Sequence, residues 1–90
     1  GWESSDWFGD YFTQKNGWIY HEDLGWCFLV IQKNNHWLWM EKYDWLWTKP
    51  SVWPYLYDNE NAKWLYLLKR KYGPSLFFDR NNEQFLPIHN

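Results

Sequence analysis

Trp37-Leu38-Trp39-Met40-Glu41-Lys42-Tyr43-Asp44-Trp45-Leu46-Trp47 is the stretch of sequence that decides the fold. It holds two triplets, each with an aromatic side chain at its first and third positions and leucine between them. Successive side chains of a β-strand point to opposite faces, so each triplet places both aromatic rings on one face of a sheet. The residues between the triplets have the length of a hairpin turn. The stretch therefore predicts two antiparallel strands joined by a short turn.

The same pattern recurs along the chain. Residues 18–28 align without gaps on residues 37–47, nineteen positions later, and residues 55–66 align on 76–87, twenty-one positions later. Such tandem self-similarity indicates an array of similar structural units. We predict a single all-β domain over residues 1–90, built from tandem antiparallel β-hairpins. Its units lie near 18–28, 37–47, 55–66 and 76–87, after a divergent opening at 1–17.

About eight to nine short strands follow from the triplets and the turn residues between them. Asn16-Gly17 is a strong hairpin signal because both residues accept a positive φ. Lys33-Asn34-Asn35 also offers residues that tolerate a left-handed conformation. Residues 62–71 suit a helix as well, but the triplet Trp64-Leu65-Tyr66 favours a strand. The expected strands fall near 7–13, 18–22, 26–32, 37–41, 44–48, 54–58, 63–68, 75–79 and 84–87.

The two faces of this sheet have different compositions. Aromatic rings line one face, and the middle leucine or isoleucine of each triplet points to the other. The middle position of one triplet holds Cys27, the only cysteine, which we expect to act as a small buried hydrophobe. Buried aliphatic residues require cover, so we expect either two layers or a sheet that curls on itself.

Composition limits the possible functions. The chain has 90 residues with ten tryptophans, seven tyrosines and six phenylalanines, and a domain this small cannot hide all of these rings. The formal charge is −2 and no stripe of lysine and arginine is present, which argues against nucleic-acid binding. No apolar stretch approaches the roughly twenty residues of a transmembrane helix.

Catalytic chemistry has weak candidates. His21 stands beside Glu22 and Asp23, but we interpret it as a strand-end residue; His36 is expected in a turn and His89 in the C-terminal tail. The spacing of histidine, cysteine and acidic residues matches no metal, cofactor or catalytic motif. Two acidic pairs recur in register, Glu22 with Glu41 and Asp58 with Asp79. They could accept hydrogen bonds from sugar hydroxyls, but we favour bonding to turn amides.

The aromatic side chains are the strongest functional lead. Flat rings can stack on sugar rings or bind quaternary amines, and they also form dry protein interfaces. A face that contacts lipid is a third possibility, which the acidic balance disfavours. The candidate interaction surface consists of Trp18, Tyr20, Trp26, Trp37, Trp39, Trp45, Trp47, Trp53, Tyr55, Tyr57, Trp64 and Tyr66.

The order of these motifs resembles two groups of bacterial surface repeats. Asn16-Gly17-Trp18-Ile19-Tyr20 and Leu24-Gly25-Trp26 resemble choline-binding and glucan-binding repeats, but the Gly-Trp spacing is lost after residue 26, so no choline site is transferred. A likeness over nearly the whole chain is to the tryptophan-rich C-terminal module of large secreted or surface proteins of marine Verrucomicrobia, Planctomycetes and Lentisphaerae. The matching motifs are Trp7-Phe8-Gly9-Asp10-Tyr11, Gly17 to Phe28, Trp37-Leu38-Trp39, Trp45-Leu46-Trp47-Thr48, Pro54-Tyr55-Leu56-Tyr57, Trp64-Leu65-Tyr66 and Phe77-Phe78-Asp79. Tyr43-Asp44 departs from the usual Leu-Gly of that pattern.

This resemblance implies a non-catalytic end module of an exported protein, located outside the cell, on its surface or in the periplasm, where it serves anchoring, sorting or assembly. We therefore expect an interaction module, not an enzyme, that docks to a protein partner or to neighbouring copies. The alternative is a carbohydrate-binding module that uses tryptophan and tyrosine platforms on a polysaccharide.

Overall fold

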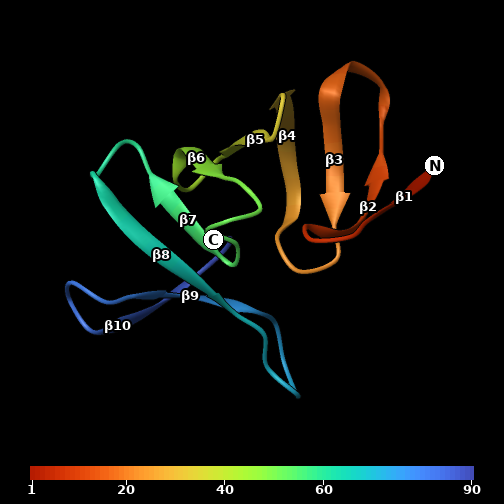
Figure 1. Cartoon of the computed structure of the whole chain (residues 1–90). Coiled ribbons are helices and arrows are strands. Elements are labelled where there is room, and N and C mark those ends of the chain that lie inside the picture. Colours follow the sequence, from red (N-terminus) through yellow and green to blue (C-terminus); the bar gives the residue numbers. More distant parts are fainter.

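The computed structural model describes residues 1–90 and contains one antiparallel sheet of ten strands, each paired with the next along the chain (Figure 1). The prediction of an all-β array of tandem hairpins is confirmed, with ten strands instead of eight to nine. The strands are β1 (Trp2–Ser5), β2 (Gly9–Thr13), β3 (Trp18–His21), β4 (Gly25–Gln32), β5 (Asn35–Met40), β6 (Asp44–Thr48), β7 (Tyr55–Asp58), β8 (Lys63–Leu68), β9 (Leu76–Asp79) and β10 (Gln84–Pro87), with a 3₁₀ turn, η1, at Lys15–Gly17. No helix has the length and apolar character needed to cross a lipid bilayer.

The additional strand lies at the N-terminus. Trp2 of β1 pairs with Phe12 of β2, in a hairpin that the sequence did not predict. Trp7 and Phe8, expected at the start of a strand over 7–13, form the turn instead. Ser5 Oγ accepts hydrogen bonds from the amides of Trp7 (3.4 Å) and Phe8 (3.0 Å), which fixes this turn. Residues 62–71 also suited a helix, and there β8 confirms the strand predicted over 63–68.

In each triplet hairpin a residue in the left-handed region lies at the start of the return strand or directly before it. These residues are Gly25 (φ 72°), Asp44 (φ 65°), Ala62 (φ 53°) and Glu83 (φ 53°). They occupy the same position when it is counted from the start of each unit. The loop is nevertheless one residue longer in the last two of these hairpins, where Asp58 pairs with Lys63 and Asp79 with Gln84. Only one of the four is glycine, which shows that pairing of the flanking strands holds the other three in a conformation that L-residues rarely adopt.

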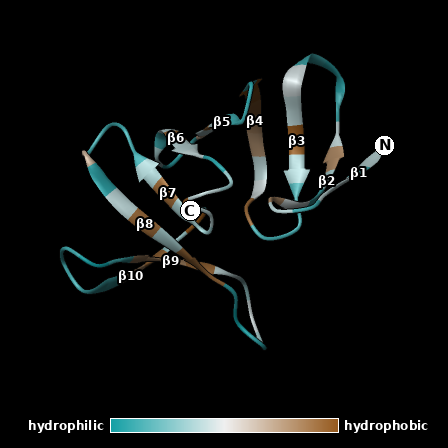
Figure 2. Ribbon diagram, in the orientation of Figure 1, coloured by the Kyte–Doolittle hydropathy of each residue, from teal (hydrophilic) through white to brown (hydrophobic).

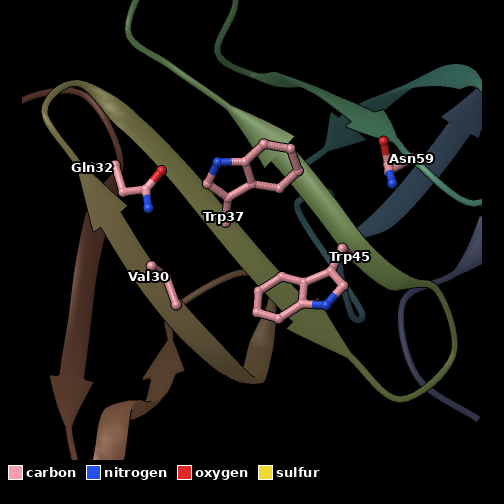
Figure 3. Close-up of a pocket in the computed structure, with 5 residues that line it drawn as sticks. All are labelled: Val30, Gln32, Trp37, Trp45 and Asn59. Atoms are coloured by element: carbon pink, nitrogen blue, oxygen red, sulfur yellow. The ribbon is translucent and has the colours of Figure 1, made fainter.

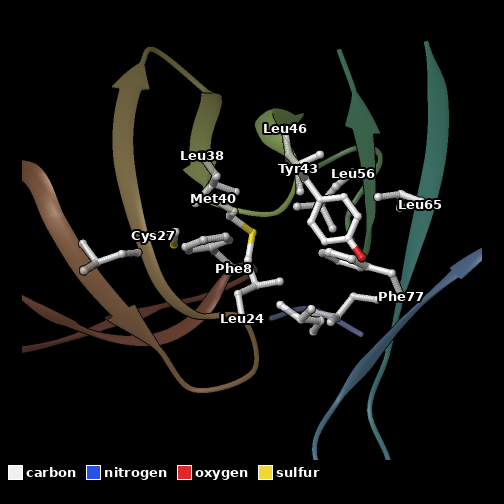
Figure 4. Close-up of a cluster of buried hydrophobic side chains, with 13 residues drawn as sticks. Phe8, Leu24, Cys27, Leu38, Met40, Tyr43, Leu46, Leu56, Leu65 and Phe77 are labelled. Carbon is white, nitrogen blue, oxygen red and sulfur yellow. The ribbon is translucent and has the colours of Figure 1, made fainter. Parts of the chain in front are cut away.

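The core is made from the middle residues of the triplets. Ile19, Cys27, Leu38, Leu46 and Leu56 are buried, as are Leu65 and Phe77 of the later units. Residues on either side of each triplet extend this inner face, and turn residues such as Leu24 and Tyr43 close it (Figure 4). Figure 2 shows the result as short hydrophobic segments between paler positions along the strands. The predicted division into an aromatic and an aliphatic face is confirmed.

The sheet curls so that the last hairpin returns to the loop between β3 and β4. His89 Nε2 lies 2.5 Å from the carbonyl oxygen of Leu24, and Ser75 Oγ lies 3.3 Å from a carboxylate oxygen of Asp23. The Tyr43 hydroxyl, in the loop between β5 and β6, donates a hydrogen bond to the carbonyl of Pro87. These contacts form a clasp across the open side of the curl, although β1 and β10 do not pair. His89, which the sequence placed in the C-terminal tail, therefore contributes a contact to the clasp.

Candidate interaction surface

The first and third residues of the triplets form one continuous surface, called here the outer aromatic face. Neighbouring strands place these rings opposite one another, as in the pairs Trp37–Trp47, Trp39–Trp45 and Tyr57–Trp64. The face comprises Trp2, Phe12, Trp18, Tyr20, Trp26, Phe28, Trp37, Trp39, Trp45, Trp47, Tyr55, Tyr57, Trp64, Tyr66, Phe78 and Phe85. It therefore runs across the whole sheet, from β1 to β10.

Most rings of this face pack edge to face. The ring centroids are 5.2 Å apart in Tyr20–Trp26, 5.0 Å in Tyr55–Tyr66 and 5.1 Å in Tyr57–Trp64, all T-shaped. Such pairs contribute about 0.5–1.5 kcal/mol each beyond the burial of their area. In a T-shaped pair the edge of one ring covers the face of the other. The outer aromatic face is therefore a packed surface more than a row of open, flat platforms.

Much of this packed surface remains open to solvent. Trp26 is 49% exposed, Tyr20 42% and Trp64 40%. The rings at its two ends, Trp2 on β1 and Phe85 on β10, are 63% and 61% exposed, because each has a neighbouring strand on one side only. Isolated exposed rings are ordinary on protein surfaces, whereas a connected series of them marks a contact surface.

All of the candidate side chains predicted from the sequence lie on this face except Trp53. That ring lies in the loop between β6 and β7 and turns inward, with its centroid 5.1 Å from Phe8 and 5.9 Å from His21. It packs against the core, so it stabilises the fold and does not form part of the outer aromatic face. Conversely, the candidate set omits Trp2, Phe12, Phe28, Phe78 and Phe85, which the strand pairing adds to the face. Three of these, Phe28, Phe78 and Phe85, stand at the first or third position of a triplet, so the alternation of the triplets could have placed them on the face.

A hollow interrupts the packed rings at Trp37. Val30 of β4 lies opposite Trp37 and is the only non-aromatic residue paired in register with a tryptophan. Its small side chain leaves a cavity of about 360 Å³ lined by Val30, Gln32, Trp37, Trp45 and Asn59 (Figure 3). In Figure 3 the two indoles project from the adjacent strands β5 and β6, with Val30 and Gln32 to one side and Asn59 to the other.

The histidine beside two acidic residues serves the fold. His21 is fully buried, and its Nδ1 accepts hydrogen bonds from the amides of Asp23 (3.0 Å) and Leu24 (3.1 Å). A neutral imidazole with an unprotonated Nδ1 carries its proton on Nε2, which here donates to the carbonyl of Phe8 at 2.6 Å. Burial lowers the pKa of His21 despite this hydrogen bond. Both ring nitrogens are occupied, which leaves neither for acid–base chemistry or a metal.

His36 is also part of the interior. The sequence placed it in a turn, but it lies in β5 and is buried, because the loop before it consists of only Lys33 and Asn34. Its ring centroid is 4.6 Å from Trp7 and 5.0 Å from Phe8, and its Nδ1 makes no hydrogen bond. Burial among these rings lowers its pKa.

The acidic residues that recur in register divide into two groups. Asp58 Oδ1 accepts hydrogen bonds from the amides of Glu60 and Asn61, both at 3.1 Å, and Asp79 Oδ1 accepts equivalent bonds from the amides of Asn81 and Asn82. The interpretation of these two as turn-binding residues is confirmed. Glu22 and Glu41 are exposed and bond to no amide, so that interpretation is wrong for them. In the first unit the turn amides are bound by His21 instead.

A polar cavity lies along the clasp. It has a volume of about 520 Å³, and its charged lining residues are Glu22, Asp23 and Arg70. Asp23 is engaged by Lys69 at 3.2 Å and by Ser75, and Arg70 Nε donates to the carbonyl of Pro74 at 2.6 Å. Asp23 thus links the loop after β3 to the segment between β8 and β9. Nowhere does the structure bring together three or more histidine, cysteine, aspartate or glutamate side chains in an arrangement that could hold a metal ion.

Compared with models of known protein families, with curated proteins and with solved structures, the chain matches none of them.

Proposed function

We propose that this chain is a non-catalytic interaction module of an exported bacterial protein, and that it docks through the outer aromatic face onto a protein partner or neighbouring copies. The observation that carries the proposal is the continuous series of interlocked rings from β1 to β10, some exposed and the others half-buried. Tryptophan and tyrosine provide most of the energetic anchors in protein interfaces. The assignment to an exported protein follows from the resemblance to the tryptophan-rich surface modules.

The packing of the rings favours a contact with protein and disfavours an array of platforms for sugar rings. A sugar ring stacks on an open aromatic face, and most faces here are covered by the edge of a neighbour, as in Trp18–Trp39 at an interplanar angle of 89°. A protein surface can bury ring edges as effectively as faces, because apolar burial has no preferred direction. The rigid rings also lose little conformational entropy when they are buried.

The proposal is tested by removing the exposed rings and following association. A variant with Trp18, Trp26 and Trp64 changed to threonine should lose concentration-dependent association in sedimentation velocity. Alternatively, it should lose a partner that is cross-linked in the native host through a photoreactive residue at position 20, where Tyr20 is 42% exposed on the same face. Tyr72→Thr is the matched control, since Tyr72 is 81% exposed but lies in the loop between β8 and β9, outside the outer aromatic face. A chain that stays monomeric at millimolar concentration and yields no cross-link through position 20 contradicts the proposal.

A further inference from the structure

Trp37 differs from every other tryptophan in the chain. Each of the other nine forms a close ring pair with another aromatic side chain, whereas Trp37 forms none. It faces the hollow left by Val30, and Trp45 borders the same hollow. This is the place on the outer aromatic face where an indole has no aromatic partner and borders a hollow (Figure 3).

Unpaired amides stand at the rim of the hollow. Gln32 and Asn59 are exposed, and their side chains make no hydrogen bond within the protein. Each amide offers two donors and one acceptor. The loop that carries Asn59 is held in place, because its backbone amide donates to the carbonyl of Trp45 at 3.2 Å. The indole N–H groups of Trp37 and Trp45 are also free, unlike that of Trp47, which donates to Asn35 at 3.1 Å.

The lining selects the chemistry of the ligand. None of the residues that line the hollow is charged, so the site favours a neutral molecule. The negative potential of an indole face attracts the weakly positive C–H groups of a sugar ring. Apolar side chains of a partner would cover the two amides without pairing them, at a cost of about 1–3 kcal/mol for each unsatisfied group. Hydroxyl groups pair with both donors and acceptors, and a cavity of about 360 Å³ lies within the usual size range of small-ligand sites.

We propose that this hollow is a binding site for one ring of a neutral saccharide. The ring stacks on Trp37 beside Trp45, and its hydroxyl groups bond to the amides of Gln32 and Asn59. The site uses a few residues in the middle of the sheet and leaves the exposed rings of β1, β3 and β10 uninvolved. It therefore adds a small-ligand function to the proposed protein contact and does not depend on it.

The experiment follows the indole N–H signals of ¹⁵N-labelled protein during titration with neutral oligosaccharides of glucose, mannose, galactose and N-acetylglucosamine. Ten tryptophans give ten such signals, which report each ring separately. We expect at least one of these sugars to shift the Trp37 and Trp45 signals selectively. Gln32→Ala should weaken that binding about tenfold, the effect of one lost hydrogen bond. Gln84→Ala, a change of another exposed glutamine on β10, should leave it unchanged.

A second variant fills the site. Val30→Trp places a large ring where the hollow lies, so it should abolish sugar binding while the remaining indole signals keep their positions. The proposal is overturned if no sugar in the panel shifts Trp37 and Trp45, if all ten signals move alike, or if Gln32→Ala binds as tightly as the parent chain. An apolar peptide that shifts the two signals when every sugar fails overturns it as well. Sedimentation reports the protein contact separately, so the two proposals fail independently.

Discussion

The ammonium nitrogen of Lys63 lies 2.7 Å from Oδ2 of Asp79 and links two hairpin units. In the strand register Lys63 stands opposite Asp58 on β7, yet its side chain reaches Asp79 at the end of β9. Asp79 Oδ2 also accepts a hydrogen bond from the side-chain amide of Asn82 at 2.9 Å. The lysine thus ties the loop of the last hairpin to the preceding strand, while Asp58 depends on its own loop alone.

Acid should weaken this link. The hydrogen bond from Lys63 and those from Asn82 lower the pKa of Asp79 to about 2, from an ordinary value of 3.8. Because the pKa of Asp79 is lower in the folded chain than in the unfolded one, its ionised form stabilises the fold at every pH above the unfolded pKa. That contribution disappears as the pH falls from about 4 to about 2. Asp79→Asn should lower the thermal midpoint at pH 7 and flatten its dependence over this range. Asp58→Asn is the control and should keep the dependence, as calorimetry at several pH values can show.

The two buried histidines predict a second loss of stability on acidification, which occurs at a higher pH than the loss caused by Asp79. Burial lowers the pKa of both His21 and His36 below the ordinary value of 6.5, so the unfolded chain binds protons more readily than the folded one. Stability should therefore fall as the pH decreases below about 6.5. Protonation of His21 at Nδ1 would also displace the amide hydrogen bonds of Asp23 and Leu24.

Urea unfolding at pH 7.5 and pH 5.5 measures this effect. His36→Phe keeps a ring among Trp7 and Phe8 and removes one titrating group, so it should reduce the difference in unfolding free energy between the two pH values. An unchanged difference in this variant, together with an unchanged difference in His21→Asn, would show that other groups cause it.

The leucines between the aromatic rings should matter more for stability than the larger tryptophans. Leu46 is fully buried, and Leu46→Ala should cost about 2–5 kcal/mol because it leaves a cavity in the core. Trp26 is 49% exposed, and Trp26→Ala should cost about 1 kcal/mol. Leu46→Met, which nearly conserves volume, is the control. Equilibrium urea unfolding compares the three, and a larger loss for Trp26→Ala than for Leu46→Ala would refute this ranking.

Cys27 should be chemically silent in the folded protein. Its side chain is fully buried, and desolvation raises the pKa of its thiol to about 12. The reactive thiolate is then almost absent at pH 8. A disulfide reagent should fail to modify the native chain within hours and should react within minutes in 6 M urea. Rapid reaction without urea would mean that β4 opens readily.

The strand pattern was predictable because it is local. An aromatic residue, an aliphatic residue and another aromatic residue fix the faces of a strand wherever they occur, and the aligned units confirmed each other. The first strand escaped prediction because Trp2-Glu3-Ser4-Ser5 holds a single aromatic ring. His36 was misplaced because the loop before it is only two residues long, and its positive φ falls on Lys33 (58°), not on an asparagine.

The clasp and the placement of Trp53 were not predictable from the sequence. The contacts of Leu24 with His89 and of Asp23 with Ser75 join residues that are 65 and 52 positions apart. No repeat or turn motif encodes such distances; they result from the twist accumulated over many strands. Trp53 was included in the candidate surface because tryptophan is common in interfaces. It stands outside any triplet, so no alternation in the sequence indicates whether its side chain points inward or outward. The hollow at Trp37 depends on Val30, whose opposition to that ring requires the register of β4 and β5.

The clasp depends on the number of hairpins that lie between the two segments it joins. In an open repeat array a unit can be gained or lost because each unit contacts only its neighbours. Here the last hairpin must arrive at the loop that follows β3, and an extra or missing unit would rotate it away from Leu24 and Asp23. Duplication of a single hairpin between these segments would therefore break the contacts of the clasp.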